Sequence, residues 1–239
     1  MSNTYFQFKQ FTIHQDRCAM KVCTDACLFG AWVAGDVRSE KYEVRTVLDI
    51  GAGTGLLSLM LAQNTSCIID AVELDEHAAE QAAENFEATP WKERLQVIRA
   101  DARTVHLGRK YDLILSNPPF FENDLKSGDT KRNLALHSEA LGMEELFAVI
   151  KKHIAENGRL ALLLPYHRKE QCKEQAAAAG FYLSKEVSVR QTPNHAYFRT
   201  MVLFTTINGP VNNVTLTIRE EDQYSLSFTE LLKDYYLKL

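Results

Sequence analysis

The feature that most restricts the fold of this chain is a regular alternation of short apolar segments and helical segments, which begins at Thr46. Short strands separated by helices form βαβ units, and nearly continuous apolar strands are typical of a parallel sheet buried on both faces. The pattern therefore predicts an α/β protein with a doubly wound, mostly parallel sheet. The expected strands are residues 46–50, 67–73, 95–99, 111–116 and 159–164. The expected helices are residues 56–63, 76–88, 143–156 and 167–179.

The alternation stops near residue 180, where an antiparallel pair of strands is expected. These strands are residues 182–190 and 197–207, and the six residues between them are too few for a helical crossover. The tail, residues 208–239, should add a strand at 214–219 and an amphipathic helix at 228–236.

The residues before the core have a mixed pattern. Residues 6–13 are strand-like, and a helix over 25–34 is expected to end at Gly35, with a polar connector at 36–45. The chain is therefore expected to divide into three parts. These are an N-terminal extension at 1–45, a core at 46–207, and a C-terminal strand and helix at 208–239 that pack on the core.

Composition excludes several classes of protein. The chain has 239 residues and a formal net charge of −4, so an RNA or DNA partner would need a local basic patch. The longest apolar runs, such as residues 160–165, are far shorter than the roughly 20 residues that span a bilayer. No secretory signal is visible, so a cytoplasmic protein without membrane contact is expected. The five cysteines include no Cys-x-x-Cys pair, so neither a zinc ribbon nor another metal site is expected.

A glycine-rich turn follows the first core strand and opens a helix. Asp49 precedes Gly51, Gly53 and Gly55, and glycines at this position let a ligand approach the backbone. The spacing is G-x-G-x-G rather than the G-x-G-x-x-G of dinucleotide sites. Asp49 would repel a pyrophosphate but attract a cationic ligand. S-adenosylmethionine (AdoMet) carries an ammonium and a sulfonium and has no phosphate, so it fits this turn better than NAD.

Two further acids stand at the ends of the next strands. Glu73 lies 24 residues after Asp49, close to the roughly 20 expected for an acid that binds ribose hydroxyls. Asp101 follows the third strand, where it can accept a hydrogen bond from an adenine amino group. Asp75 is ambiguous, since it can instead cap the next helix. Acids at three successive strand ends predict a nucleoside cleft.

The fourth strand ends in Asn117-Pro118-Pro119-Phe120, the most informative stretch of the chain. The two prolines fix a stiff extended corner. The side-chain oxygen of Asn117 and the carbonyl of Pro118 can accept both hydrogens of a planar amine, which localises its lone pair for attack. Phe120 can stack on the base that carries the amine. Asn117, Pro118 and Phe120 are therefore the predicted catalytic residues, with Asn117 also beside the cofactor.

Together, the glycine turn and the Asn-Pro-Pro-Phe corner resemble the class I AdoMet-dependent amino methyltransferases. The N-terminal stretch, with Phe8-Lys9-Gln10-Phe11 and residues 16–25, is similar to the bacterial tRNA(Val) adenine-N6 methyltransferases, as is the tail. Cys23 departs from that pattern, where a glycine is expected, and so does Phe121 beyond the motif. The resemblance implies a seven-stranded sheet with an antiparallel last strand, and an N-terminal extension that covers the cleft. It also implies that Lys21 and Thr24 contact the cofactor.

The implied substrate is the adenosine immediately 3′ of the anticodon in tRNA(Val), flipped out of its loop. Phosphate contacts require Lys or Arg, and the best candidates follow the catalytic corner. The expected substrate-binding residues are Phe120, Phe121, Lys126, Lys131 and Arg132. Arg17, Lys21, Arg190 and Arg199 are alternative RNA contacts, and no obligate protein partner is evident.

Three other functions remain open on sequence grounds. The same corner serves methylation of a protein glutamine or of guanine N2 in rRNA. A nicotinamide-dependent oxidoreductase is opposed by Asp49 and by the glycine spacing. A non-catalytic nucleoside-binding module is opposed by the intact corner at Asn117.

Overall fold

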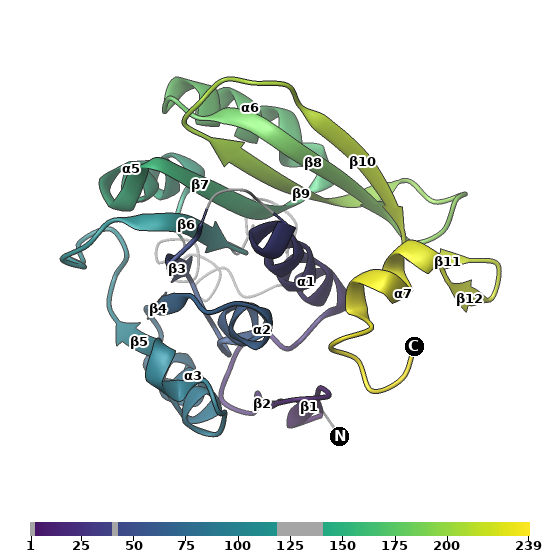
Figure 1. Cartoon of the computed structure of the whole chain (residues 1–239), viewed down its shortest axis with the longest axis horizontal. Helices are drawn as coiled ribbons and strands as arrows, with labels where there is room; N and C mark the ends of the chain where they lie inside the picture. The colour runs from purple at the N-terminus through teal and green to yellow at the C-terminus, as the bar shows by residue number, and fades with distance from the viewer. Residues whose placement is uncertain (1–2, 40–42, 119–140) are drawn as a thin grey trace, which may run out of the picture.

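The computed structural model describes residues 3–39, 43–118 and 141–239. Its centre is an eight-stranded sheet with the strand order β10-β8-β9-β7-β6-β3-β4-β5 (Figure 1). The strands are β3 (Thr46–Ile50), β4 (Ile68–Glu73), β5 (Leu95–Arg99), β6 (Tyr111–Ser116), β7 (Ile154–Pro165), β8 (Tyr182–Arg190), β9 (Tyr197–Thr205) and β10 (Asn212–Thr217).

All neighbouring strands of this sheet pair in parallel except at β9, which runs antiparallel to both β7 and β8. The doubly wound, mostly parallel α/β fold is therefore confirmed. The expected seven strands are β3 to β9, but the sheet has one strand more. The strand expected in the tail is β10, and it joins the same sheet by pairing in parallel with β8.

Helices cover both faces of the sheet (Figure 1). The helices α1 (Thr24–Ser39), α2 (Leu56–Asn64) and α7 (Leu226–Leu232) bury their apolar side chains in one core, to which α3 (Glu76–Glu87) adds Phe86. The helices α5 (Met143–His153) and α6 (Lys169–Ala178) pack in a second core on the other face.

Strand β7 shows how one strand serves both cores. Leu160, Leu162 and Leu164 belong to the second core, whereas Ala161 and Leu163 belong to the first. This division follows from the period of two in a β-strand, and it explains why the segment is apolar throughout.

Both ends of the chain pack beside the first core. The hairpin of β1 (Tyr5–Gln7) and β2 (Thr12–His14) touches the tail, where the N–H of Lys9 donates to the carbonyl of Tyr235 at 2.8 Å. The Tyr235 hydroxyl donates to the Met60 carbonyl in α2. The short pair β11 (Arg219–Glu220) and β12 (Gln223–Tyr224) precedes α7.

The expected end of the first helix at Gly35 is wrong, because α1 continues to Ser39. The helix is extended by contacts with residues that are distant in the sequence. Asp36 is buried in the continued helix, where it pairs with Arg159 at 2.7 Å and with Lys185 at 2.5 Å. No neighbour of Gly35 in sequence reveals these partners. In the same way, β7 begins at Ile154, inside the helix expected at 143–156, because Ile154 pairs with Tyr111 of β6.

No helix in the described residues is both long and apolar enough to cross a bilayer.

Candidate active site at the carboxyl edge of the sheet

Four of the predicted site positions stand at the ends of four neighbouring strands. The strand order β6-β3-β4-β5 places Asn117, Asp49, Glu73 and Asp101 side by side along the carboxyl edge. In an open α/β sheet this edge is where ligands bind. The structure thus brings together residues that are up to 68 positions apart in sequence.

The glycine turn lies open at this edge. Gly51 and Gly53 have φ angles of 74° and 54°, which side chains other than glycine rarely adopt. Among the described residues, no atom lies within 4 Å of the position that a Cβ would take at either glycine. The turn is fastened to β4, since the N–H of Gly51 donates to the Val72 carbonyl at 2.8 Å. A ligand can therefore approach the backbone here without displacing a side chain of the described chain.

Asp49 is completely buried beneath the turn. One carboxylate oxygen, Oδ2, accepts a hydrogen bond from the Ser58 hydroxyl at 2.7 Å. The other, Oδ1, has no hydrogen-bond partner within the described part of the chain. Burial raises the pKa of Asp49 to about 7, partly offset by the Ser58 hydrogen bond. A buried carboxylate with an unused oxygen is costly to ionise alone, so it is suited to a cationic ligand.

Glu73 is half-buried at the end of β4 and is oriented by two backbone donors. The N–H of Gly53 donates to Oε2 at 2.8 Å, and the N–H of Asp75 donates to Oε1 at 2.9 Å. Each oxygen keeps a lone pair, so the carboxylate can still accept hydrogen bonds from two hydroxyls. Asp75 itself caps α3 by accepting from the N–H of Ala78 at 2.8 Å, which supports the capping interpretation of that residue.

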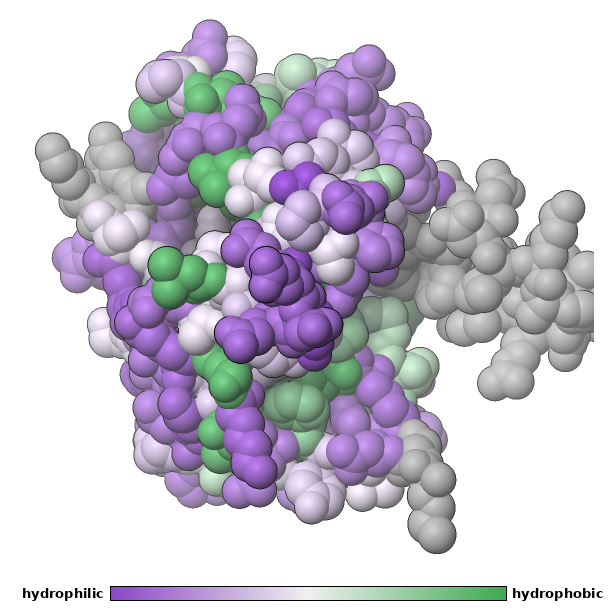
Figure 2. All heavy atoms as spheres, turned by 90° about the vertical axis from the view of Figure 1, so that its right-hand side faces the viewer, coloured by the Kyte–Doolittle hydropathy of each residue, from purple (hydrophilic) through white to green (hydrophobic). Residues whose placement is uncertain are grey.

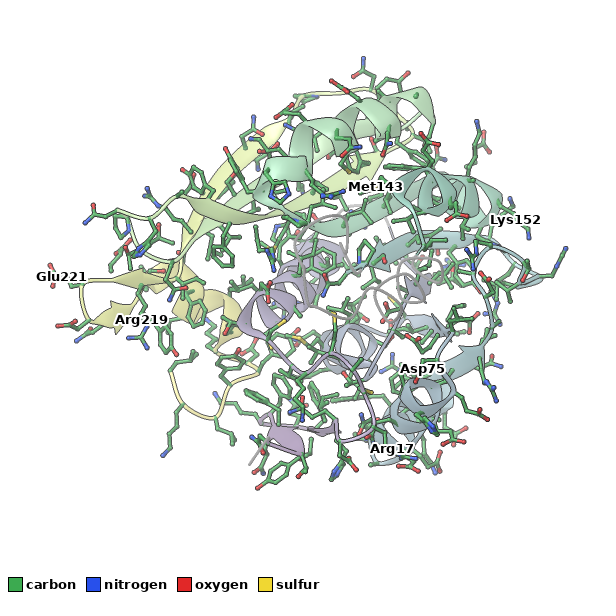
Figure 3. The ribbon with its side chains drawn as sticks, turned by 180° about the vertical axis from the view of Figure 1, so that it is seen from behind. Arg17, Asp75, Met143, Lys152, Arg219 and Glu221 are labelled. Carbon is green, nitrogen blue, oxygen red and sulfur yellow. The ribbon has the colours of Figure 1, made fainter. Side chains whose placement is uncertain are left out.

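The N-terminal segment passes beside this carboxylate. Burial and the nearby carboxylates of Glu73 and Asp75 raise the pKa of Cys18 to about 11. Arg17, the preceding residue, forms ion pairs with Glu80 and Glu84 of α3. Figure 3 shows Arg17 and Asp75 on these two adjoining parts of the molecule. Arg17 is thus engaged with acids rather than held ready for a phosphate.

Asp101 has a close partner that the sequence interpretation did not include. The guanidinium of Arg103 forms a two-pronged ion pair with it, with Nε at 2.9 Å from Oδ1 and Nη2 at 2.7 Å from Oδ2. These hydrogen bonds lower the pKa of Asp101. The acid is therefore anchored, and only its remaining lone pairs can receive an adenine amino group.

Asn117 and Pro118 directly follow β6, so they stand at the same carboxyl edge of the sheet as the acids. Asn117 is half-buried and Pro118 is buried. The preceding Ser116 fixes the strand end, since its hydroxyl donates to the Ile50 carbonyl of β3 at 2.7 Å. The other predicted substrate residues lie outside the described residues, namely Phe120, Phe121, Lys126, Lys131 and Arg132.

Lys21 and Thr24 lie between β2 and the start of α1. The Lys21 ammonium is exposed and donates to the Asn3 carbonyl at 3.0 Å. Thr24 is the first residue of α1 and hydrogen-bonds Tyr236. Arg199, one of the alternative RNA contacts, pairs with Asp25 at 2.7 Å.

Sequence reasoning missed three residues that shape this site. Ser58 holds Asp49, Arg103 holds Asp101, and Asn85 of α3 links the N-terminal segment to the glycine turn. Asn85 donates to the carbonyls of His14 and Thr54, both at 2.9 Å. Arg103 had a detectable signal, because it follows Asp101 by two residues beyond a strand. Asn85 had none, since its partners are 71 and 31 residues away.

The residues present fit AdoMet. The buried unused oxygen of Asp49 suits a cation, the open glycine turn suits a ligand in contact with the backbone, and the Glu73 carboxylate suits a pair of hydroxyls. No group of three or more His, Cys, Asp or Glu in the described residues is arranged to hold a metal ion.

Comparison with known proteins agrees with this geometry. Residues 37–183 match the family described as the methyltransferase small domain. A protein of Dyadobacter fermentans named tRNA1(Val) (adenine(37)-N6)-methyltransferase is 41% identical over 99% of this chain and 98% of its own length. Proteins of the same name from Parabacteroides distasonis and Tolumonas auensis are 40% and 42% identical, over 100% of this chain and 100% and 99% of their own lengths.

Solved structures show the same fold at low sequence identity. A predicted O-methyltransferase of Agrobacterium tumefaciens, 15% identical, superposes with a TM-score of 0.64 over 88% of this chain and 96% of its own. The glycopeptide N-methyltransferase MtfA in complex with AdoMet, 13% identical, gives 0.53 over 73% of this chain and 93% of its own. The resemblance seen in the motifs is confirmed: the chain belongs to the methyltransferase family whose members in these bacteria are named tRNA1(Val) (adenine(37)-N6)-methyltransferase.

Proposed function

We propose that this chain transfers the methyl group of AdoMet to the exocyclic N6 amine of an adenosine in tRNA, the one immediately 3′ of the anticodon in tRNA(Val). The observation that carries the proposal is the position of Asn117 and Pro118, at the end of β6 and next to the acid-lined glycine turn on β3. Methylation of an amine by AdoMet requires hydrogen-bond acceptors for the amine next to the site that binds the cofactor. The name shared by relatives at about 40% identity supports the tRNA substrate.

The cofactor roles follow from the contacts described above. We assign the cation to Asp49, whose Oδ1 has no hydrogen-bond partner within the described residues, and the backbone contact to Gly51, Gly53 and Gly55. Gly55 differs from the other two, because a Cβ there would clash with the Phe86 ring, so it also lets α3 pack against the turn. Glu73 is assigned to the ribose hydroxyls. The remaining proposed cofactor contacts are Asp101, Asn117, Lys21 and Thr24. When bound, AdoMet supplies a methyl group on a positively charged sulfur, which is a good leaving group.

The catalytic corner acts on the amine. The lone pair of an adenine amino group is delocalised into the ring, so the planar amine is a poor nucleophile. The Asn117 side-chain oxygen and the Pro118 carbonyl each accept one N–H, and their placement favours a tetrahedral nitrogen. Because the prolines fix the corner beforehand, little entropy is lost when the amine is held. After attack on the methyl carbon, the nitrogen loses one proton to water, so no strong base is needed.

The substrate side is assigned to residues that follow the corner. Phe120 and Phe121 are proposed to stack on the flipped base, and Lys126, Lys131 and Arg132 to contact phosphates. The proposed partner is the tRNA anticodon loop, with no obligate protein partner and with a cytoplasmic location. We also propose that residues 1–45 act as an extension over the cleft, on the core of residues 46–207, and that residues 208–239 pack on that core. The link from Asn85 to both His14 and Thr54 supports the extension.

The test is incubation of the protein with labelled AdoMet and total RNA from a strain that lacks it, followed by nucleoside analysis. We expect N6-methyladenosine in the anticodon loop of tRNA(Val), and strongly reduced incorporation with Asn117→Ala. Label found only in a guanine or in a protein glutamine would replace the proposed substrate. Tighter binding of NAD than of AdoMet in calorimetry would overturn the reaction class.

A further inference from the structure

The cation–π pairs of the described residues lie along one edge of the sheet. Four aromatic rings have a cationic side chain over them, and all four lie at the carboxyl edge of the outer half of the sheet. They are Tyr166, Tyr197, Phe198 and Tyr224, which we call the aromatic edge. Such pairs occur roughly once per 70–80 residues, so about three would be expected in a chain of this length, without any common location.

The topology explains how these rings come together. Tyr166 directly follows β7, and Tyr197 and Phe198 begin β9, which is antiparallel and so starts at the edge where β7 ends. Tyr224 lies in β12, just beyond the end of β10. The rings of Tyr166 and Tyr197 are 5.0 Å apart. Both are half-buried, so each keeps an accessible part.

The cations of this edge come from separate elements. Lys169 lies 4.5 Å above the Tyr166 ring, and Arg190 lies 5.7 Å from the Tyr197 ring. Arg190 is also held in place, because its Nε donates to Thr217 at 3.0 Å and its Nη1 to the Pro193 carbonyl at 2.9 Å. Within the described residues, no carboxylate forms an ion pair with Arg190 or with Arg219. Lys169, by contrast, is paired with Glu186 at 3.0 Å, and Arg199 is paired with Asp25 at 2.7 Å. Of the described residues, Arg190 and Arg219 are therefore the cations of this edge whose charge can meet a phosphate.

The aromatic edge is close to the catalytic corner. Leu162 of β7 pairs with Ser116, the residue before Asn117, and Tyr166 lies four residues further along. At about 3.3 Å per residue, this is roughly 13 Å along the strand and one strand spacing of about 5 Å across. A few nucleotides of a single-stranded loop span that distance.

We propose that the aromatic edge is a second RNA contact of the enzyme, where a base neighbouring the methylated adenosine stacks on Tyr166 and Tyr197 while Arg190 contacts a phosphate. This inference rests on the proposed function and goes beyond it, because it names the surface that binds the nucleotides next to the methylated adenosine. Stacking rings combined with unneutralised cations are the chemistry by which proteins bind unpaired nucleic acid. In a chain of net charge −4, such a local patch is required.

The surrounding surface favours a polar partner. Figure 2 shows the side of the molecule that carries β10, β11, β12 and the turn between β8 and β9. Its coloured surface is mostly hydrophilic, and apart from one larger green area below the centre the hydrophobic groups are small and separated by polar residues. A docking site for a folded protein usually has one contiguous apolar patch. RNA is therefore the occupant to which we commit.

The test uses a labelled anticodon stem–loop RNA and measures its Kd at several salt concentrations. For Tyr197→Leu we expect about 5- to 150-fold weaker binding, corresponding to one lost base stack. For Arg190→Gln we expect weaker binding and a salt slope smaller by about 0.7. Tyr182→Leu is the matched ring control, since Tyr182 is exposed at the opposite end of β8. Arg45→Gln is the matched charge control, and neither control should change the RNA Kd.

AdoMet affinity should be unchanged in all variants, which shows that the folded core is retained, although Arg190→Gln also removes the hydrogen bonds to Thr217 and Pro193 and should lower the melting temperature slightly. If Tyr197→Leu does not fold, Tyr166→Leu gives the same test from another element. Wild-type RNA affinity in both folded tyrosine variants, with an active wild-type enzyme, would overturn the aromatic edge but leave the proposed function standing. A wild-type protein that neither binds nor methylates RNA would instead overturn the proposed function. Altered affinity for a protein substrate alone would make this surface a protein contact and contradict the inference.

Discussion

The two halves of the sheet present different kinds of side chain at the same edge. On the half formed by β3, β4 and β5, the strand ends carry Asp49, Glu73 and Asp101. On the half formed by β7, β9, β8 and β10, the edge carries aromatic rings with cations over them, and among the described residues Arg190 is one of these cations without an ion-pair partner. A cationic cofactor fits the first half and a polyanionic RNA fits the second. The overall charge of −4 conceals this division, so the charge of the whole chain says little about its ligands.

The boundary between the halves is β6, whose end carries Asn117 and Pro118. Variants of the acidic half should therefore change cofactor binding alone, and variants of the aromatic edge should change RNA binding alone. Variants at the boundary should change the chemical step. Each prediction below can break this division.

The largest effect is expected at the boundary. Asn117→Ala should lower kcat by on the order of a hundredfold or more, because the lost hydrogen bond strengthens as the amine becomes tetrahedral. The KM for tRNA and the Kd for AdoMet should change little. Steady-state kinetics on tRNA measures the effect, and Asn213→Ala, an exposed asparagine on β10, is the control. A near-normal kcat would remove Asn117 from the reaction.

The next effect belongs to the acidic half. Glu73→Ala should weaken AdoMet binding by about 1.5–3 kcal/mol, the range for hydrogen bonds to a charged acceptor. Part of the loss will come from the Gly53 N–H, which loses its acceptor. Calorimetry measures it, and Glu76→Ala on the exposed first turn of α3 is the control. If Glu73→Ala lowers the affinity for RNA instead, the acidic half does more than bind the cofactor.

A pH dependence follows from Asp49. Its pKa is raised to about 7, so the folded chain without cofactor favours the protonated acid. That contribution to stability is complete below the unfolded pKa of about 3.8 and is lost as pH rises through about 7. A cation favours the ionised acid, so AdoMet affinity should rise about tenfold between about pH 6 and pH 8, with proton release on binding at the lower pH. Asp49→Asn should bind more weakly and without this dependence, and a pH-independent wild type would contradict the role of Asp49.

The same division shows what sequence alone can predict. The bounds of β3, β5 and β6 agree with the expected ranges, because periodicity and the flanking glycines and prolines act locally. The positions of the three acids could be predicted for the same reason, since each lies within two residues of the carboxyl end of a strand whose pattern is local: Asp49 in β3, Glu73 at the end of β4 and Asp101 after β5.

The outer half depends on contacts between distant segments, which periodicity does not encode. The rings of Tyr166 and Tyr197 meet only because β9 enters the sheet beside β7. Likewise, α1 continues beyond Gly35 because Asp36 forms an ion pair with Arg159, which is 123 residues away in the sequence. The sequence identified Arg190 and Arg199 as cations, but only the structure separates Arg190 from Arg199, which Asp25 neutralises.

The smallest effect tests how the acidic half is held. Arg103→Ala removes the ion pair to Asp101, whose side chain is 28% exposed, and should cost about 0.2–1 kcal/mol of unfolding free energy at neutral pH. Because Arg103 lowers the pKa of Asp101 in the folded state, this stability is present above the unfolded pKa and is lost as pH falls through the folded pKa. Urea unfolding should therefore separate variant from wild type at pH 7 but not in strong acid.

Arg99→Ala, which breaks a more exposed pair with Glu76, is the control and should cost no more than Arg103→Ala. AdoMet affinity decides what the ion pair does for the cofactor. If Arg103 only anchors the acid in place, the variant should bind AdoMet a few-fold more weakly, because Asp101 is then free to turn away. If Arg103 instead competes with the adenine amino group for Asp101, the variant should bind AdoMet more tightly. In that case the cofactor has to break the bidentate Arg103–Asp101 ion pair when it binds.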